Sequence, residues 1–89
     1  MNNKVIHIEV DDWEVIYFKG KKFAEGHEIK EEKLIRLGML MQEAKMDISD
    51  FVSIYIEEDD VSDEELLWTW DADIGKLPDE IKNIITENI

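Results

Sequence analysis

The sequence has no cysteine, and only one proline and four glycines among its 89 residues. Without cysteine, neither a disulfide framework nor a thiolate metal site is available. The glycines stand apart from one another, so there is no glycine-rich loop that could hold a phosphate. No apolar run reaches the roughly 18 residues of a membrane span, and MNNKVIHIEV lacks the basic and apolar regions of a signal peptide. These absences predict a cytoplasmic protein without a cofactor or membrane anchor.

Basic residues are also scarce. Ten Lys and Arg stand against 23 Asp and Glu, which gives a net charge of −13, whereas small domains commonly carry a magnitude of about 2–8. Residues 1–46 hold eight bases and nine acids, while residues 47–89 hold two bases and fourteen acids. Almost all of the excess therefore lies in the second half. Such a chain is not expected to bind nucleic acid or a membrane directly; it is expected to attract basic proteins.

Catalytic and metal-binding patterns are missing as well. With no cysteine and no serine in a G-x-S-x-G turn, only His7 and His27 are candidate bases near neutral pH. His7 is expected to be a surface or edge residue of a strand, and His27 is expected to have a structural role. DADIGKLPDEIK begins like a calcium loop, but its glycine, Gly75, is at position 5 instead of 6, and Lys82 occupies the place of the final Glu. We therefore predict a protein that is not an enzyme, with no catalytic residues and no metal site.

The pattern of apolar residues predicts a mixed fold. Alternating or β-rich segments at 4–10, 13–19, 22–29 and 50–58 predict strands, the first three as an antiparallel meander. Residues 13–19 are apolar on both faces, which favours a central strand. Residues 30–45 have helical spacing, with a stripe of Leu34, Leu37, Met41 and Ala44. A C-terminal helix after Pro78 would bury Ile81, Ile84 and Ile85.

The segment LLWTW leaves two interpretations open. Ser62 and Glu65 have the spacing of a capping box, which would begin a short helix. Alternation in residues 66–70 equally suits a fifth strand, which would place Trp68 and Trp70 on one face. In either case residues 1–89 form a single α+β domain: an antiparallel sheet of four or five strands with two or three helices on one face.

Residues 56–73 concentrate the acidic charge, with nine acids, no base and two tryptophans. Thirteen net charges equal those on about 22 Å of duplex DNA. A rigid row of carboxylates could therefore imitate phosphates, and tryptophans could add apolar contact area. The alternatives are a merely solubilising acidic face and tryptophans that belong to the core. The candidate partner-binding residues are Glu57, Glu58, Asp59, Asp60, Asp63, Glu64, Glu65, Trp68, Trp70, Asp71 and Asp73.

The segment DDWEVIYFKGKKFAEGHEI carries a further pattern, formed by Asp12, Trp13, Glu14, Tyr17, Gly20, Glu25, Gly26 and His27. This pattern, with LPDEI as a second match, resembles small proteins of bacteriophages and prophages of Gram-positive bacteria. The resemblance implies a phage source but no particular activity. By analogy, phages encode unrelated acidic inhibitors that mimic DNA and block host nucleoid proteins, nucleases and other defence factors.

The sequence thus leads to one main hypothesis and two alternatives. The main hypothesis is an acidic DNA mimic, free to form a homodimer, that blocks the DNA-binding surface of a basic host protein. The first alternative is a structural or regulatory phage protein whose acids only solubilise it and whose apolar patch mediates self-association. The second is a small-ligand pocket near Trp13 and His27.

Overall fold

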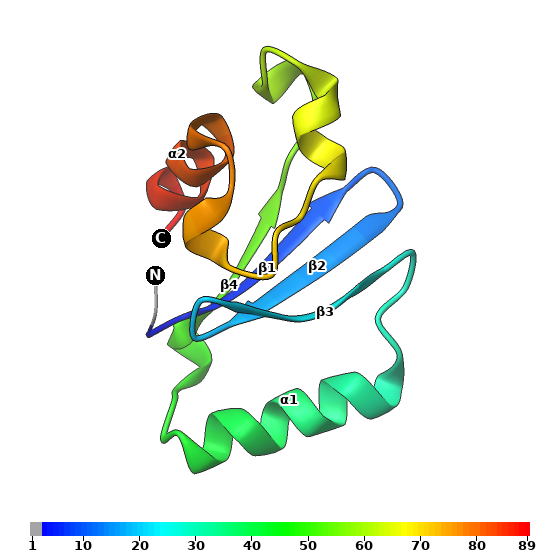
Figure 1. Cartoon of the computed structure of the whole chain (residues 1–89). Coiled ribbons are helices and arrows are strands. Elements are labelled where there is room, and N and C mark those ends of the chain that lie inside the picture. The colour runs from blue at the N-terminus through cyan, green and yellow to red at the C-terminus, as the bar shows by residue number, and fades with distance from the viewer. Residues whose placement is uncertain (1–2) are drawn as a thin grey trace.

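The computed structural model describes residues 3–89 and contains a four-stranded sheet with two α-helices (Figure 1). The strands are β1 (Val5–Val10), β2 (Trp13–Phe18), β3 (Lys21–Gly26) and β4 (Phe51–Tyr55). The helices are α1 (Glu31–Glu43) and α2 (Asp79–Glu87). The predicted α+β class is confirmed. Neither helix in this part of the chain has the length and apolar character needed to cross a bilayer.

The strand order is β3-β2-β1-β4, and the meander of β1, β2 and β3 is antiparallel as predicted. The β2–β3 turn places Lys19 and Gly20 at positive φ, of 52° and 81°, which matches a two-residue hairpin turn that follows the twist of the strands.

The pairing of β4 corrects the expectation of a purely antiparallel sheet. It runs parallel to β1, with Val5 opposite Phe51 and Ile8 opposite Ile54. The reason is the path of α1, which carries the chain back from the end of β3 to the end of the sheet where β1 begins (Figure 1). Alternation in the sequence indicates a strand but carries no information on its direction.

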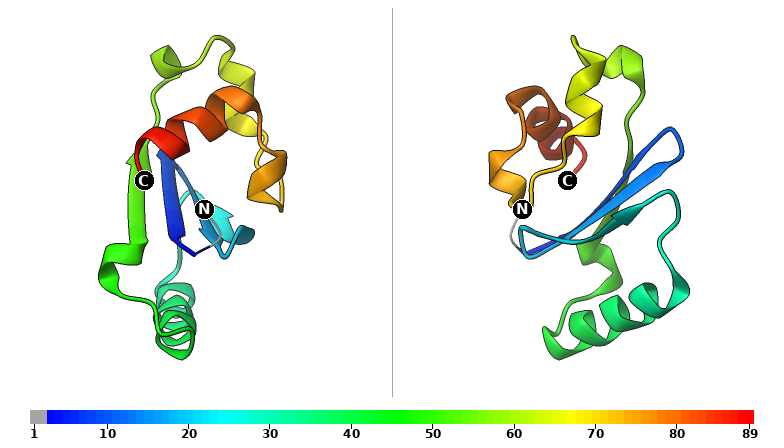
Figure 2. Two further views of the ribbon diagram at one scale, coloured as in Figure 1. Left: turned by 90° about the vertical axis from the view of Figure 1, so that its left-hand side faces the viewer. Right: turned by 45° about the vertical axis from the view of Figure 1, so that its right-hand side comes forward.

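The two helices cover opposite faces of the sheet, whereas we expected both on one face (Figure 2). On one face α2 and the segment before it bury Ile6, Ile8 and Tyr17. On the other face α1 covers Val5 and Ile16. Because β1 and β2 are the central strands and carry apolar residues on both faces, both faces need a cover.

Helix α1 buries few apolar side chains against the sheet. Of its predicted apolar stripe only Leu37 is buried, Met41 and Ala44 are half-buried, and Leu34 is 47% exposed. On α2, by contrast, Ile81 and Ile85 are fully buried and Ile84 is half-buried. The main core therefore lies between the sheet and α2.

Between β4 and α2 the chain forms short 3₁₀ turns, and LLWTW is not a fifth strand. A 3₁₀ helix covers Glu64–Trp68, and its N-cap is Asp63 instead of the expected Ser62. Further 3₁₀ turns cover Glu58–Asp60 and Ile74–Lys76. The helical path separates the two tryptophans: Trp68 is 53% exposed and Trp70 is 7% exposed.

Candidate functional site

The acids of the second half gather on a projecting segment, residues 57–68, which we call the acidic lobe. It extends beyond the end of the sheet where β4 stops (Figure 1). Seven of its side chains are acidic and all seven are exposed: Glu57, Glu58, Asp59, Asp60, Asp63, Glu64 and Glu65. Within residues 3–89, none of them forms an ion pair. The negative field of the lobe is therefore not neutralised by neighbouring bases in the described chain.

The backbone of the lobe is held in place by its own acids and by α2. The carboxylate of Asp60 accepts a hydrogen bond from the Glu57 N–H at 2.8 Å, and that of Asp63 accepts one from the Glu65 N–H at 3.0 Å. The Ser62 N–H donates to Glu80 on α2 at 2.7 Å, and its hydroxyl donates to the same carboxylate. These two bonds, the hydroxyl's first, lower the pKa of Glu80 below its ordinary value. The backbone that carries the acidic side chains is thus held in place.

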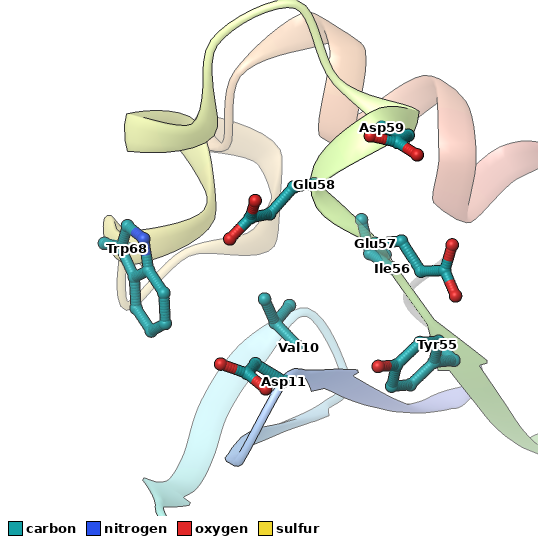
Figure 3. A pocket seen from close by; sticks show the side chains of 8 residues that line it. All are labelled: Val10, Asp11, Tyr55, Ile56, Glu57, Glu58, Asp59 and Trp68. Carbon is teal, nitrogen blue, oxygen red and sulfur yellow. The ribbon is translucent and has the colours of Figure 1, made fainter.

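A cleft of about 300 Å³ separates the lobe from the ends of β1 and β4 (Figure 3). Trp68 and Tyr55 stand on opposite sides of it, and the Glu58 carboxylate reaches toward the side of Trp68. Asp11, in the β1–β2 turn, lies at the lower edge. The buried side chains of Val10 and Ile56 also line the cleft, while Glu57 and Asp59 point away from its centre.

The chemistry of this cleft suits a cationic side chain. Carboxylates attract and hydrogen-bond a guanidinium or ammonium group, and an indole face adds a cation–π contact. The apolar base formed by Val10 and Ile56 can pack against the methylene stem of Arg or Lys. The arrangement could therefore hold a guanidinium or ammonium group.

Three of the predicted binding residues lie away from this surface. Trp70 was expected as an anchor, but it packs in the core, where its Nε1–H donates to the Leu67 carbonyl at 2.9 Å. Asp71 accepts a hydrogen bond from the Asp73 N–H at 2.9 Å. Asp73 accepts one from the Gly75 N–H at 2.9 Å and pairs with Lys21 at 3.0 Å. These contacts, the Gly75 bond first, lower the pKa of Asp73.

Asp71 and Asp73 thus support the fold instead of forming a charged surface. The segment that contains them runs along the outer edge of β3, with the Lys22 N–H donating to the Ala72 carbonyl at 2.8 Å and an isolated bridge between Lys21 and Asp73. The remaining eight predicted residues are all in the acidic lobe. Four residues of the cleft were missed: Val10, Asp11, Tyr55 and Ile56. Val10 and Asp11 lie at the end of the predicted strand 4–10 and just after it, and Tyr55 and Ile56 lie in the predicted strand 50–58.

Residues of the phage-type pattern meet where β2 begins and β3 ends. The rings of Trp13 and His27 meet edge to face at 4.9 Å, and the Trp13 indole N–H donates to Glu25 at 3.3 Å. His27 also lies 3.2 Å from the Asp12 carboxylate. Comparison with family models, curated proteins and solved structures finds no match to this chain. The resemblance to phage proteins therefore stays a prediction.

The residues best placed to hold a metal ion lie outside both the lobe and the DADIG segment. They are His7, Glu9 and Glu14, which come together on the α1 face of the sheet. None of them lines the cleft.

Proposed function

We propose that this protein is a cytoplasmic, phage-type binding protein, not an enzyme, whose acidic lobe occupies the DNA-binding surface of a basic host protein. The observation that carries the proposal is the set of seven exposed carboxylates, without ion-pair partners in residues 3–89, beside a cleft that contains Trp68. Nucleoid proteins, nucleases and other defence factors are the class of partner that this surface suits.

The physical basis is competition for the same cations. Lys and Arg side chains that bind DNA phosphates displace counterions, and carboxylates held in fixed positions can engage the same side chains. The held backbone of the lobe matters here, because a flexible acidic tail would lose conformational entropy on binding. Binding is therefore expected to weaken steeply as salt is added.

The cleft adds an apolar and aromatic contact to the attraction between charges. An Arg or Lys of the partner that enters between Glu58 and Trp68 would lose contact with water on one side, and aromatic residues in such positions often dominate binding energy. Trp68 is the anchor we propose, and Asp11 would contact the same cation from the other edge of the cleft.

A competition assay tests the proposal. A purified basic nucleoid protein is first bound to a fluorescent DNA duplex. The acidic protein is then added at low and at high salt. We expect it to displace the duplex at low salt, and the lobe triple variant to displace it at least about tenfold less well. The lobe triple variant is Glu58→Gln, Asp59→Asn and Glu64→Gln, three acids whose carboxylates make no hydrogen bond to other described residues.

The matched control removes the same charge from the other side of the molecule. The control triple variant is Glu28→Gln, Glu32→Gln and Glu43→Gln, all exposed. If both triple variants displace the duplex equally poorly, net charge alone accounts for the effect, and the acidic lobe is not the binding site. If no basic DNA-binding protein in a panel of nucleoid proteins and nucleases is displaced, the DNA-mimic function is wrong.

A second candidate function is self-association, with acids that only solubilise the protein. It is favoured by the exposure of Ile35 and Met39 on α1 and of Ile48, which is 85% exposed. Beside them a hollow of about 480 Å³ is lined by Met41, Met46 and Phe51, among others. Sedimentation of wild type and Met39→Lys separates the two candidates: a dimer that dissociates in this variant, with partner binding unchanged in the lobe triple variant, favours self-association.

A further inference from the structure

A second polar cluster lies on the face of the sheet that α1 covers. His7 and Glu9 alternate onto this face of β1, and Glu14 of β2 lies directly opposite Glu9 in the strand register. Each of the three offers one ligand atom, and these atoms all lie within 4.8 Å of one another. A single ion at their centre could contact one imidazole nitrogen and two carboxylate oxygens.

Two of these side chains are already oriented by groups outside the cluster. The Nδ1 atom of His7 lies 2.8 Å from the Ser53 hydroxyl oxygen on β4. One oxygen of Glu14 lies 2.8 Å from His7 Nε2, and its other oxygen accepts a hydrogen bond from the Ile29 N–H at 3.3 Å. An imidazole held through one nitrogen, with its other nitrogen facing the ligand position, is the usual arrangement at protein metal sites.

The tautomer of His7 decides whether an ion is accepted. If Nδ1–H donates to the Ser53 hydroxyl, Nε2 presents a lone pair toward the Glu14 carboxylate. In the free protein a proton on Nε2 can bridge the two groups, and a divalent ion can replace this proton. The Ser53 hydroxyl can accept a hydrogen bond from Nδ1–H or donate one to an unprotonated Nδ1, so it can pair with either tautomer of His7.

The surroundings also suit a bound ion. The side chains of His7 and Glu14 are only 16% and 23% exposed, and a hollow of about 260 Å³ beside them is lined by the apolar residues Ile16, Ile29 and Phe51, among others. Partial burial strengthens the attraction between an ion and its ligands. The hollow leaves room for water or a small ligand on the ion.

We infer that His7, Glu9 and Glu14 form a site for one divalent ion of the zinc class, with at least one position open to water. The imidazole favours Zn²⁺ or Co²⁺ over Mg²⁺ and Ca²⁺, which prefer oxygen ligands only. Three protein ligands leave one position of a tetrahedral zinc ion open to water, unlike structural zinc sites, in which four protein ligands close the coordination shell. This inference goes beyond the proposed binding function and does not depend on it.

Zinc titration of the full chain, followed by calorimetry and by the imidazole NMR signals, tests the inference. We expect one equivalent of Zn²⁺ to bind and to shift the His7 signals while those of His27 stay in place. Glu9→Gln is the cleanest ligand variant, because the Glu9 side chain makes no hydrogen bond in residues 3–89, and it should weaken this binding at least about tenfold. Ser53→Ala, which removes only the group that orients His7, should weaken it by about tenfold.

The lobe triple variant is the control for adventitious binding by surface acids. It should keep the one-equivalent zinc site with unchanged affinity. The inference is overturned if Glu9→Gln and His7→Gln bind zinc as tightly as wild type, or if the binding is lost in the lobe triple variant instead. Circular dichroism of each variant checks that it is folded, and the Glu9 variant decides the result if His7→Gln is not.

Discussion

The hydroxyl of Tyr17 donates a hydrogen bond of 2.6 Å to the backbone carbonyl of Asp71. Tyr17 is fully buried in the central strand β2, and burial, followed by the nearby Glu25, Asp71 and Asp73 charges, raises its pKa far above the ordinary value for tyrosine. The phenol therefore stays protonated and remains a donor across the whole working pH range. It joins the sheet to the segment that returns from the acidic lobe.

Tyr17→Phe should lower the free energy of unfolding by about 1–3 kcal/mol, because it leaves a part-buried carbonyl without its donor. For a domain of this size, each kcal/mol corresponds to about 4–8 °C in melting temperature. Tyr55→Phe is the matched control, since Tyr55 is 55% exposed and its hydroxyl bonds no other residue of the described chain. Urea unfolding of both variants measures the difference, and equal stability of the two would mean that the Tyr17 bond contributes nothing.

Asp73→Asn should make the free energy of unfolding depend less on pH in the acidic range. The pKa of Asp73 is lowered in the folded protein by the Gly75 N–H and by Lys21. A lowered pKa means that the carboxylate stabilises the fold above its unfolded pKa, near 4, and that this contribution is lost as the pH falls through the folded value. The difference in stability between wild type and Asp73→Asn should therefore be largest above about pH 4 and shrink below it.

Urea midpoints measured from pH 7 down to pH 2 give this difference at each pH. Asp59→Asn is the control, because the Asp59 side chain is exposed and makes no hydrogen bond or ion pair in residues 3–89. A constant difference between wild type and Asp73→Asn at all pH values would contradict the role assigned to Asp73.

Added salt should raise the melting temperature at neutral pH. The seven lobe acids lie close together in sequence and lack ion-pair partners in the described chain, so they repel one another in the folded protein. Salt screens this repulsion, with a Debye length of about 10 Å at 0.1 M. Calorimetric scans at increasing sodium chloride should show the rise, and it should be smaller in the lobe triple variant. A melting temperature that does not respond to salt would argue against a crowded acidic lobe.

The meander and both helices could be predicted because their signals are local. Alternation and a two-residue turn specify β1 to β3, and Ile81 and Ile85 specify the buried side of α2. The pairing of β4 could not be predicted, because it depends on where α1 delivers the chain. LLWTW was ambiguous because its apolar residues suit period 2 as well as the spacing of three between Leu67 and Trp70.

The candidate site was predictable in its charge but not in its geometry. A count of acids treats Asp73 and Glu58 alike, yet Asp73 caps a turn and pairs with Lys21 while Glu58 faces a cleft. Asp11 joins the cleft only because the β1–β2 turn lies below the lobe. The cluster of His7 and Glu14 depends on strand register, which no spacing in the sequence reports.

The two tryptophans of the lobe region should differ in stability effect. Trp70 is buried and its indole N–H is hydrogen-bonded to Leu67, so Trp70→Phe removes both volume and a donor and should cost about 1–3 kcal/mol. Trp68 is 53% exposed, so Trp68→Phe should change the free energy of unfolding by less than about 0.5 kcal/mol. Urea unfolding of the two variants measures this difference, and a large loss with Trp68→Phe would place its indole in the core.

The fluorescence of Trp68 should also report the charge of the cleft. Its indole stands near the carboxylates of Glu58 and Asp11 (Figure 3), so the local field attracts the cationic quencher caesium and repels the anionic quencher iodide. Caesium should therefore quench the protein more effectively than iodide, relative to free tryptophan, and Trp68→Phe should remove most of that preference. The preference should fade at high sodium chloride, where the field is screened. Equal quenching by both ions would mean that the cleft carries no net negative field, and it would remove the electrostatic basis for placing a partner's cation there.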